Sequence, residues 1–258
     1  MRWERASERI QDFIRKRVEL ANAEGVVVGV SGGVDSATVA FLCVKALGSE
    51  GVFATIMPEK GVTPEEDVEH AEKVCRMLGV DYRVIEINPF VEPFRKSFGE
   101  DCLIAFANTK PRIRMAINYY FANSMNRLVA GTGNKSELKM GYFTKYGDGG
   151  VDFLPIGDLY KTEVFGLARF LGVPEEIIKK KPSARLWKGQ TDEGEMGISY
   201  HDLDRILRGI EMGLSPEDIS IKEGLDISDI EKVIRAVEAS RHKRELAPIA
   251  PVRALLEF

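Results

Sequence analysis

The residues best suited to chemistry form one short run, Ser31-Gly32-Gly33-Val34-Asp35-Ser36. It follows Val26–Val30, a β-branched stretch that predicts a strand buried on both faces, and it precedes an apolar helix. The first amides of a helix point outward there, and the helix dipole favours an anion. Glycines let the backbone approach a ligand, and serine hydroxyls can donate to phosphate oxygens. We therefore expect a phosphate-binding loop made of Gly29, Val30, Ser31, Gly32, Gly33, Val34, Asp35 and Ser36.

This loop differs from two better known phosphate-binding loops. It lacks the Lys-Ser/Thr pair that follows the last glycine of a kinase-type P-loop, and it lacks the G-x-G-x-x-G spacing of dinucleotide folds. The alternative interpretation is a tight strand-to-helix turn in which the glycines serve packing and Asp35 caps the helix.

Strand and helix patterns alternate around the loop, which predicts the elements that position it. Parallel neighbours in a sheet need long crossovers, so this alternation predicts an α/β fold with a mostly parallel sheet and helices on both faces. Expected strands are Val26–Val30, Val52–Met57, Tyr82–Ile87 and Arg127–Gly131. Expected helices are Arg5–Leu20, Ser36–Leu47, Thr63–Leu78, Arg112–Met125, Lys161–Leu171, Asp202–Met212, Pro216–Ser220 and Ser228–Ser240, with hydroxyl caps at Thr63 and Ser228.

Two segments without periodicity separate these elements. Residues 142–158 are rich in Gly, Asp and Lys, which predicts an ordered loop that faces a ligand. Residues 181–197 contain one proline and several glycines, and we expect this segment to be mobile.

Composition excludes several classes of protein. The 258 residues carry a formal charge of -4, which argues against a surface built to bind nucleic acid. Three cysteines, far apart and without metal-type spacing, predict reduced thiols. Neither a secretory signal nor a membrane span is evident, so we expect a cytoplasmic protein.

The run SGGVDS resembles the pyrophosphate-binding loop of the ATP pyrophosphatases, which split ATP into AMP and pyrophosphate to activate an acyl group. Later motifs are similar to those of the NAD synthetase family and occur in its order. They are GTGNKSE at 131–137, FTKYGDGGVD at 143–152, PI at 155–156, LYKTE at 159–163, KPSA at 181–184, QTDE at 190–193 and HKR at 242–244. The sequence departs from several bacterial members at Gly133 and Asn134, so no contact is carried over to these two.

The resemblance implies a Rossmann-like three-layer sandwich and a single NAD synthetase domain over 1–258. Its ATP-pyrophosphatase core is expected over about 24–172, and a mobile loop and helices over about 173–258. The implied reaction adenylates the nicotinate carboxylate of deamido-NAD with ATP, and ammonia then displaces AMP to give NAD. The length leaves no room for a glutaminase domain, so free ammonia is the expected donor. The family also implies a homodimer.

The resemblance further assigns roles to individual residues. Asp35 and Glu137 match ligands of Mg²⁺, and hard oxygen donors suit that ion. Thr132, Lys161 and Ser183 match contacts to ATP, with Lys161 acting on the phosphate oxygens as a point charge and Ser183 as a hydrogen-bond donor. The positions that match contacts to deamido-NAD are Arg112, Lys145, Asp152, His242 and Lys243. Because His242 lies far along the chain, it is a candidate to act on a partner subunit's substrate.

Deprotonation of ammonium and the reaction class leave alternatives open. Either Asp148 or Asp152 is a candidate to bind ammonium and take its proton. Taken alone, Arg112 and Lys145 would be solvated charges, and Glu137 an exposed helix residue. The competing functions are a tRNA-modifying enzyme that also adenylates its substrate, and a regulator that holds ATP without turnover.

Overall fold

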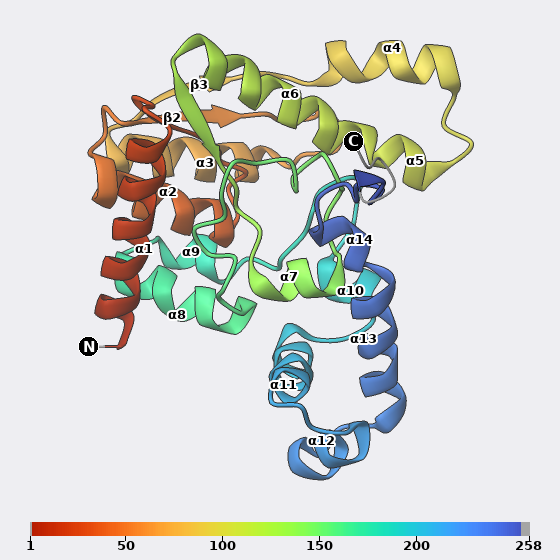
Figure 1. Cartoon of the computed structure of the whole chain (residues 1–258). Coiled ribbons are helices and arrows are strands. Elements are labelled where there is room, and N and C mark those ends of the chain that lie inside the picture. The colour runs from red at the N-terminus through yellow and green to blue at the C-terminus, as the bar shows by residue number, and fades with distance from the viewer. Residues whose placement is uncertain (1, 254–258) are drawn as a thin grey trace.

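The computed structural model describes residues 2–253, which fold around a parallel sheet (Figure 1). The strands are β1 (Gly25–Gly29), β2 (Val52–Ile56), β3 (Asp81–Val84) and β4 (Arg127–Ala130), in the spatial order β3-β2-β1-β4. β1 pairs with β2 on one side and with β4 on the other. All four predicted strands are confirmed, and so is the parallel sheet.

Helices cover both faces of the sheet and make it the middle of three layers. On one face α6 (Thr109–Ser124) packs against β1 and β4, where Val27 meets Ala122. On the other face α2 (Val34–Leu47) and α3 (Glu65–Leu78) pack on β1 and β2, and Val26 and Val28 enter the main core. β1 is thus buried on both faces, as a strand in the centre of a parallel sheet should be.

The amphipathic helix α1 (Arg2–Leu20) packs against α2 and closes this side of the core. Its buried residues include Ile14 and Val18, while its charged side chains face solvent. α8 (Lys161–Leu171) packs against α2 as well. Within residues 2–253 no helix combines the length and the apolar character needed to cross a membrane.

The remaining helices lie around the sheet or beyond it. α4 (Asn88–Phe98) and α5 (Leu103–Ala107) stand out at one end of α6 (Figure 1). α11 (Tyr200–Glu211), α12 (Pro216–Glu223) and α13 (Ile227–Ala239) share a second apolar core that includes Leu203, Ile219 and Ile230. The short helices are α7 (Lys135–Met140), α9 (Glu175–Ile178), α10 (Asp192–Met196) and α14 (Arg241–Arg244).

Two predicted helix caps are wrong. Thr63 Oγ1 accepts a hydrogen bond from the Glu59 amide in the preceding turn (2.9 Å), and Pro64 occupies the N-cap of α3 without a side-chain hydrogen bond. α13 begins one residue earlier than predicted because Asp226 caps it by accepting from the Ser228 amide (2.8 Å). At α3 the Glu59 amide takes the Thr63 hydroxyl that was expected to cap the helix, and at α13 the Asp226 carboxylate caps the helix in place of Ser228.

The three cysteines are free, and their environments predict very different reactivity. Burial raises the pKa of both Cys43 and Cys75 to about 12, whereas Cys102 is exposed. Because the thiolate is the nucleophile, iodoacetamide at pH 8 should spare Cys43 and Cys75 in the native protein. Mass spectrometry should find no adduct on these two residues in the native chain and three adducts after denaturation. Rapid modification of Cys43 in the native protein would contradict this.

Candidate active site

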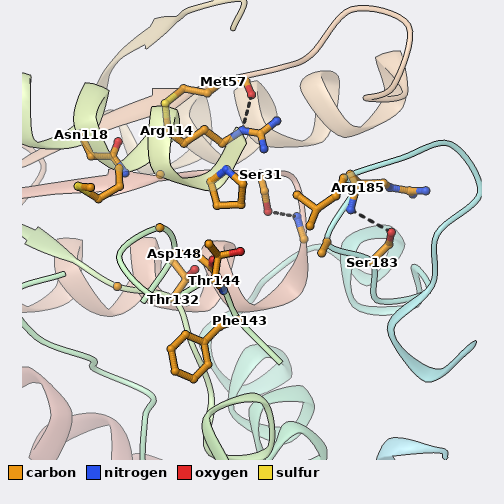
Figure 2. Close-up of a pocket in the computed structure, with 18 of the residues that line it drawn as sticks. Ser31, Met57, Arg114, Asn118, Thr132, Phe143, Thr144, Asp148, Ser183 and Arg185 are labelled. Atoms are coloured by element: carbon orange, nitrogen blue, oxygen red, sulfur yellow. Dashed lines mark hydrogen bonds between the residues drawn. The ribbon is translucent and has the colours of Figure 1, made fainter. Parts of the chain in front are cut away.

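A cavity of about 480 Å³ opens at the carboxyl ends of β1, β2 and β4. Gly29 and Val30 contribute to its wall after β1, Met57 after β2, and Gly131 and Thr132 after β4. Figure 2 shows Asn118 and Arg114 on one side of the cavity and Ser183 and Arg185 on the other. Open α/β sheets bind ligands at this edge.

A second pocket of about 140 Å³ shares part of the same wall. Ser31, Gly33, Thr132, Asp148 and Ser183 line both spaces. Asp35, Ser36, Glu137 and Lys161 line the smaller one. The structure therefore brings together most of the residues predicted to bind ATP and metal.

The loop before α2 has the form of an anion site. The Ser31 amide donates to Ser36 Oγ (3.1 Å), and the Gly33 amide donates to Ser31 Oγ (3.3 Å). Gly33 is the N-cap residue, and no side chain among residues 2–253 makes a capping hydrogen bond to α2. The first amides of α2 are thus available to an anion. The alternative in which Asp35 caps the helix is wrong.

Two members of the predicted loop serve the fold instead of lining these spaces. Gly32 has φ +75°, and a Cβ added there would lie 2.1 Å from the carbonyl oxygen of Asp67 in α3. The Val34 side chain is buried in the main core. Gly32 therefore lets the loop pack closely on α3, which fixes the loop's position.

Lys161 stands between the two predicted metal ligands. Its Nζ lies 2.5 Å from Asp35 Oδ2 and 3.2 Å from Glu137 Oε1, and the residue is 2% exposed. Although burial opposes its charge, Asp35 and Glu137 hold the pKa of Lys161 above its ordinary value. Burial raises the pKa of Glu137 to about 7 against the opposing effect of Lys161. The two carboxylates thus converge on one cation.

Asn134 aligns both carboxylates, although the sequence comparison left it without a role. Its Oδ1 accepts from the Glu137 amide (3.1 Å), and Glu137 Oε2 accepts from the Asn134 amide (3.3 Å), which completes a capping box on α7. Its Nδ2 donates to Asp35 Oδ1 (3.0 Å). The sequence signal was present in Asn134-x-x-Glu137, which has capping-box spacing.

Sequence reasoning also missed a third carboxylate, Asp192. The residue is 4% exposed and lines the smaller pocket. Tyr200 OH donates to Asp192 Oδ2 (3.0 Å), while Asp192 Oδ1 is buried without a hydrogen-bond partner. Burial raises the pKa of Asp192. Asp35, Glu137 and Asp192 therefore place more negative charge around the pocket than Lys161 alone neutralises.

Helix α11 also helps to fix the position of Lys161 through hydrogen bonds to the start of α8. Ser136 Oγ accepts from the Lys161 amide (2.9 Å) and donates to Asp204 Oδ1, and the Thr162 amide donates to Asp204 Oδ2 (2.9 Å). Asp204 is completely buried in α11. One carboxylate thus fixes the start of α8, where Lys161 is the first residue.

Three residues predicted to bind deamido-NAD lie together and line neither pocket. Arg112 Nε donates to the Lys145 carbonyl (3.3 Å), and Lys145 Nζ donates to the His242 carbonyl (2.7 Å). Arg112 and His242 are exposed. Asp152 is engaged elsewhere, because it accepts from Tyr119 OH (3.1 Å) and from the Val129 amide (2.7 Å).

Lys243 and Asp148, which were also predicted to be site residues, both line the large cavity. Lys243 Nζ donates to the carbonyls of Gly141 (2.7 Å) and Phe143 (3.0 Å). Asp148 Oδ1 accepts from the Thr144 amide (2.9 Å). Desolvation of its carboxylate by the surrounding protein raises the pKa of Asp148. Of the two ammonium candidates, Asp148 lines the cavity and Asp152 does not.

The chain is similar to known proteins along nearly all of its length. Residues 6–247 match the family described as NAD synthase. A relative named NH(3)-dependent NAD(+) synthetase, from Archaeoglobus fulgidus, is 65% identical over 256 residues, which cover 99% of this chain and 100% of the relative. A structure described as NMN synthetase from Francisella tularensis has 35% identity and a TM-score of 0.86, covering 96% of this chain and 98% of that one.

A further structural relative is NH3-dependent NAD synthetase from Campylobacter jejuni. It has 35% identity and a TM-score of 0.83, covering 97% of this chain and 99% of that chain. These similarities span nearly all of the chain, so both pockets and the residues that line them lie within the matched region.

Proposed function

Because this chain belongs to the NAD synthase family, whose members catalyse the final step of NAD biosynthesis, we propose that its pockets convert deamido-NAD, ATP and ammonia into NAD, AMP and pyrophosphate. The chain is a ligase that uses ATP as co-substrate. The observation that carries the assignment to this site is the position of Lys161, Asp35 and Glu137 beside the uncapped start of α2.

ATP lies with its phosphates in the smaller pocket. The first amides of α2 and the hydroxyls of Ser31 and Ser36 bind the departing pyrophosphate, while Lys161 contacts the phosphate oxygens. Thr132 and Ser183 line both pockets; Ser183 also contacts the phosphates, and Thr132 contacts the rest of the nucleotide. This placement directs the α-phosphate toward the larger cavity, where an acyl substrate fits.

Mg²⁺ fits the same carboxylates. Lys161 Nζ already shows that a cation can lie between Asp35 and Glu137, and Asp192 Oδ1 is a buried oxygen without a partner. Among residues 2–253 no three acidic, His or Cys side chains are grouped closely enough to hold a metal by themselves. We infer that phosphate oxygens and water complete the coordination. When bound, the ion neutralises charge on the phosphates and on the leaving pyrophosphate.

The reaction then has two steps. A nicotinate carboxylate oxygen attacks the α-phosphorus, forms a P–O bond and breaks the bond to the bridging oxygen of pyrophosphate. Ammonia next attacks the acyl carbon and forms the C–N bond; the added nitrogen then loses a proton to water, and the bond between the acyl carbon and the AMP oxygen breaks. Asp148, which lines both pockets, accepts the proton that ammonium loses. Positioning two anionic reactants in line, with their charge neutralised, supplies most of the catalysis.

We propose that the chain works as a homodimer through α4 and α5. Their exposed apolar residues include Phe98 (80% exposed) and Ile104 (69% exposed), and monomers rarely expose a large contiguous apolar patch. Both helices pack against α6, whose first turns carry Arg112. A second copy over this face would cover the exposed cluster of Arg112, Lys145 and His242 and complete the dinucleotide site.

A double variant tests the dimer. Light scattering should give twice the mass of one chain for the wild type, and the mass of one chain for Phe98→Glu/Ile104→Glu. The variant should also have a higher KM for deamido-NAD. Ile221→Glu on α12 is the matched control, since Ile221 is 83% exposed and lies in the C-terminal helices. A wild-type protein with the mass of a single chain would contradict the proposal.

One assay tests the function directly. The purified protein is incubated with ATP, Mg²⁺, ammonium and deamido-NAD, and AMP and NAD should appear in equal amounts. Nicotinic acid mononucleotide is the matched alternative substrate, because one structural relative is named an NMN synthetase. A higher kcat/KM for the mononucleotide would overturn the choice of substrate, and AMP formation without an amide product would overturn the second step.

A further inference from the structure

Asp67 is a buried carboxylate of α3 that the proposed chemistry does not use. It is 3% exposed, and both of its oxygens are paired with cations from a distant segment. Lys180 Nζ lies 2.7 Å from Oδ1, and Arg185 Nε lies 2.9 Å from Oδ2. His70, one turn further along α3, contacts the same Lys180 Nζ through Nδ1 (3.3 Å). A single side chain thus anchors both ends of residues 180–185 to α3.

The segment held by Asp67 forms one wall of the ATP pocket. Ser183 lies between the two anchored cations and lines both pockets, and Arg185 lines the larger one (Figure 2). Ser183 Oγ accepts from the Arg185 amide (3.2 Å) and donates to the Gln190 carbonyl (2.7 Å). The position of Ser183 therefore depends directly on that of Arg185.

The backbone of Asp67 touches the phosphate loop. Gly32 of the phosphate loop packs so closely on the Asp67 carbonyl that an added Cβ would lie 2.1 Å from that oxygen. α3 at Asp67 is therefore in contact with the phosphate loop through its main chain and with the 180–185 segment through its carboxylate. Asp67 fixes the spacing between the two segments that are proposed to contact ATP.

Further along, the segment has a second attachment. Lys110 Nζ donates to the Leu186 carbonyl (2.7 Å) and pairs with Glu59 (2.8 Å). The Asp192 amide donates to the Pro182 carbonyl (3.1 Å) and closes residues 182–192 into a compact loop. Loss of Asp67 alone would therefore detach from α3 the half of this loop that carries Ser183, while Lys110 keeps hold of the other half.

We propose that Asp67 is a positioning residue for ATP, which holds the Ser183 segment against the phosphate loop through Lys180 and Arg185. The proposal rests on the proposed function for the identity of the nucleotide. Asp67 lines the larger cavity, and its two oxygens are paired with Lys180 and Arg185, so it acts through the segment that these cations belong to. Its effect is confined to nucleotide affinity, while the reacting groups near Lys161 keep their arrangement.

The test measures nucleotide affinity and local opening in the purified full chain. In Asp67→Asn, loss of the charge pairing should raise the Kd of ATP, by calorimetry, and the KM for ATP by about tenfold or more, with a smaller change in kcat. Trypsin should cleave after Lys188 at least about fivefold faster, because the loop opens without global unfolding. The KM for deamido-NAD should stay within about twofold.

Two further variants test the route of the effect. Arg185→Gln leaves Lys180 on Asp67 and should raise the Kd of ATP by about threefold; the double variant should bind ATP no more weakly than Asp67→Asn. Glu176→Gln is the matched control. It breaks the half-exposed pair between Lys73 of α3 and Glu176 of α9 (2.5 Å) and should leave ATP affinity and tryptic cleavage unchanged.

The outcomes separate this inference from the function itself. An unchanged Kd and unchanged cleavage after Lys188 in Asp67→Asn would overturn the positioning role, even if the wild type makes NAD. If Asp67→Asn fails to fold, the inference depends on Arg185→Gln, and unchanged ATP affinity in that variant would overturn it. A wild type that binds ATP but makes no NAD would contradict the proposed function. The effect of Asp67→Asn on ATP affinity and on cleavage after Lys188 could still be measured and would still test the positioning role.

Discussion

An Asp35→Asn enzyme should fold normally and turn over at least about a hundredfold more slowly than the wild type. The amide keeps the shape of the side chain but loses the charge that pairs with Lys161 and is proposed to bind Mg²⁺. Lys161 retains Glu137 as a partner, so the buried cation stays paired. Steady-state kinetics at saturating substrates measure the loss, and the thermal midpoint checks the fold.

The matched control for Asp35 is Asp158→Asn. Asp158 also pairs with a lysine, Lys135 (3.1 Å), but its side chain is 98% exposed, so the same chemical change there should leave kcat within about twofold. Raising the Mg²⁺ concentration should recover part of the activity of Asp35→Asn, because Glu137 still provides one carboxylate. Wild-type turnover in Asp35→Asn would remove Asp35 from the metal site.

The largest loss is expected for Lys161→Met. Removal of this ammonium takes away the charge that contacts ATP and leaves the buried carboxylates of Asp35 and Glu137 close together without their shared cation. Activity should fall by at least about a thousandfold. Because breaking a buried pair is strongly destabilising, the Tm should fall by an amount on the order of 10 °C.

One variant separates the charge from the shape of Lys161, and a second, at Lys179, is its matched control. Lys161→Arg keeps the charge, but a planar guanidinium does not fit a site enclosed to 2% exposure, so most of the activity should still be lost. Lys179→Met removes a lysine that is 75% exposed and should change neither activity nor Tm. A fully active Lys161→Met enzyme would show that the phosphates are held by other groups.

Much of the fold could be predicted because its strongest patterns are local. The β-branched run at β1 and the glycines that follow it set both the strand and the loop, and the structure confirms them. Residues that share a strand end, such as Gly29 and Thr132, could be placed at the same cavity because parallel strands end at one edge. The short helices could not be predicted, since a helix of about one turn has too few residues for a periodic signal.

The part of the site that was missed depends on contacts between distant segments. Asp192 and Asp67 are ordinary acidic residues in the sequence, and only folding places the first beside Tyr200 and the second between Lys180 and Arg185. Arg114 and Asn118 point into the cavity from α6, a helix whose pattern does not distinguish a ligand-facing side from a solvated one. Sequence spacing has no information on which pairs of charges meet.

The hydrogen bonds of Asp204 have a consequence for any attempt to shorten the chain. A fragment ending at Gly172 would retain the sheet, the phosphate loop and Lys161 itself, yet it would lack the carboxylate that holds Ser136 and the Thr162 amide in place. The nucleotide-binding half is therefore not a transferable module, and protein engineers who wish to graft it should carry α11 with it.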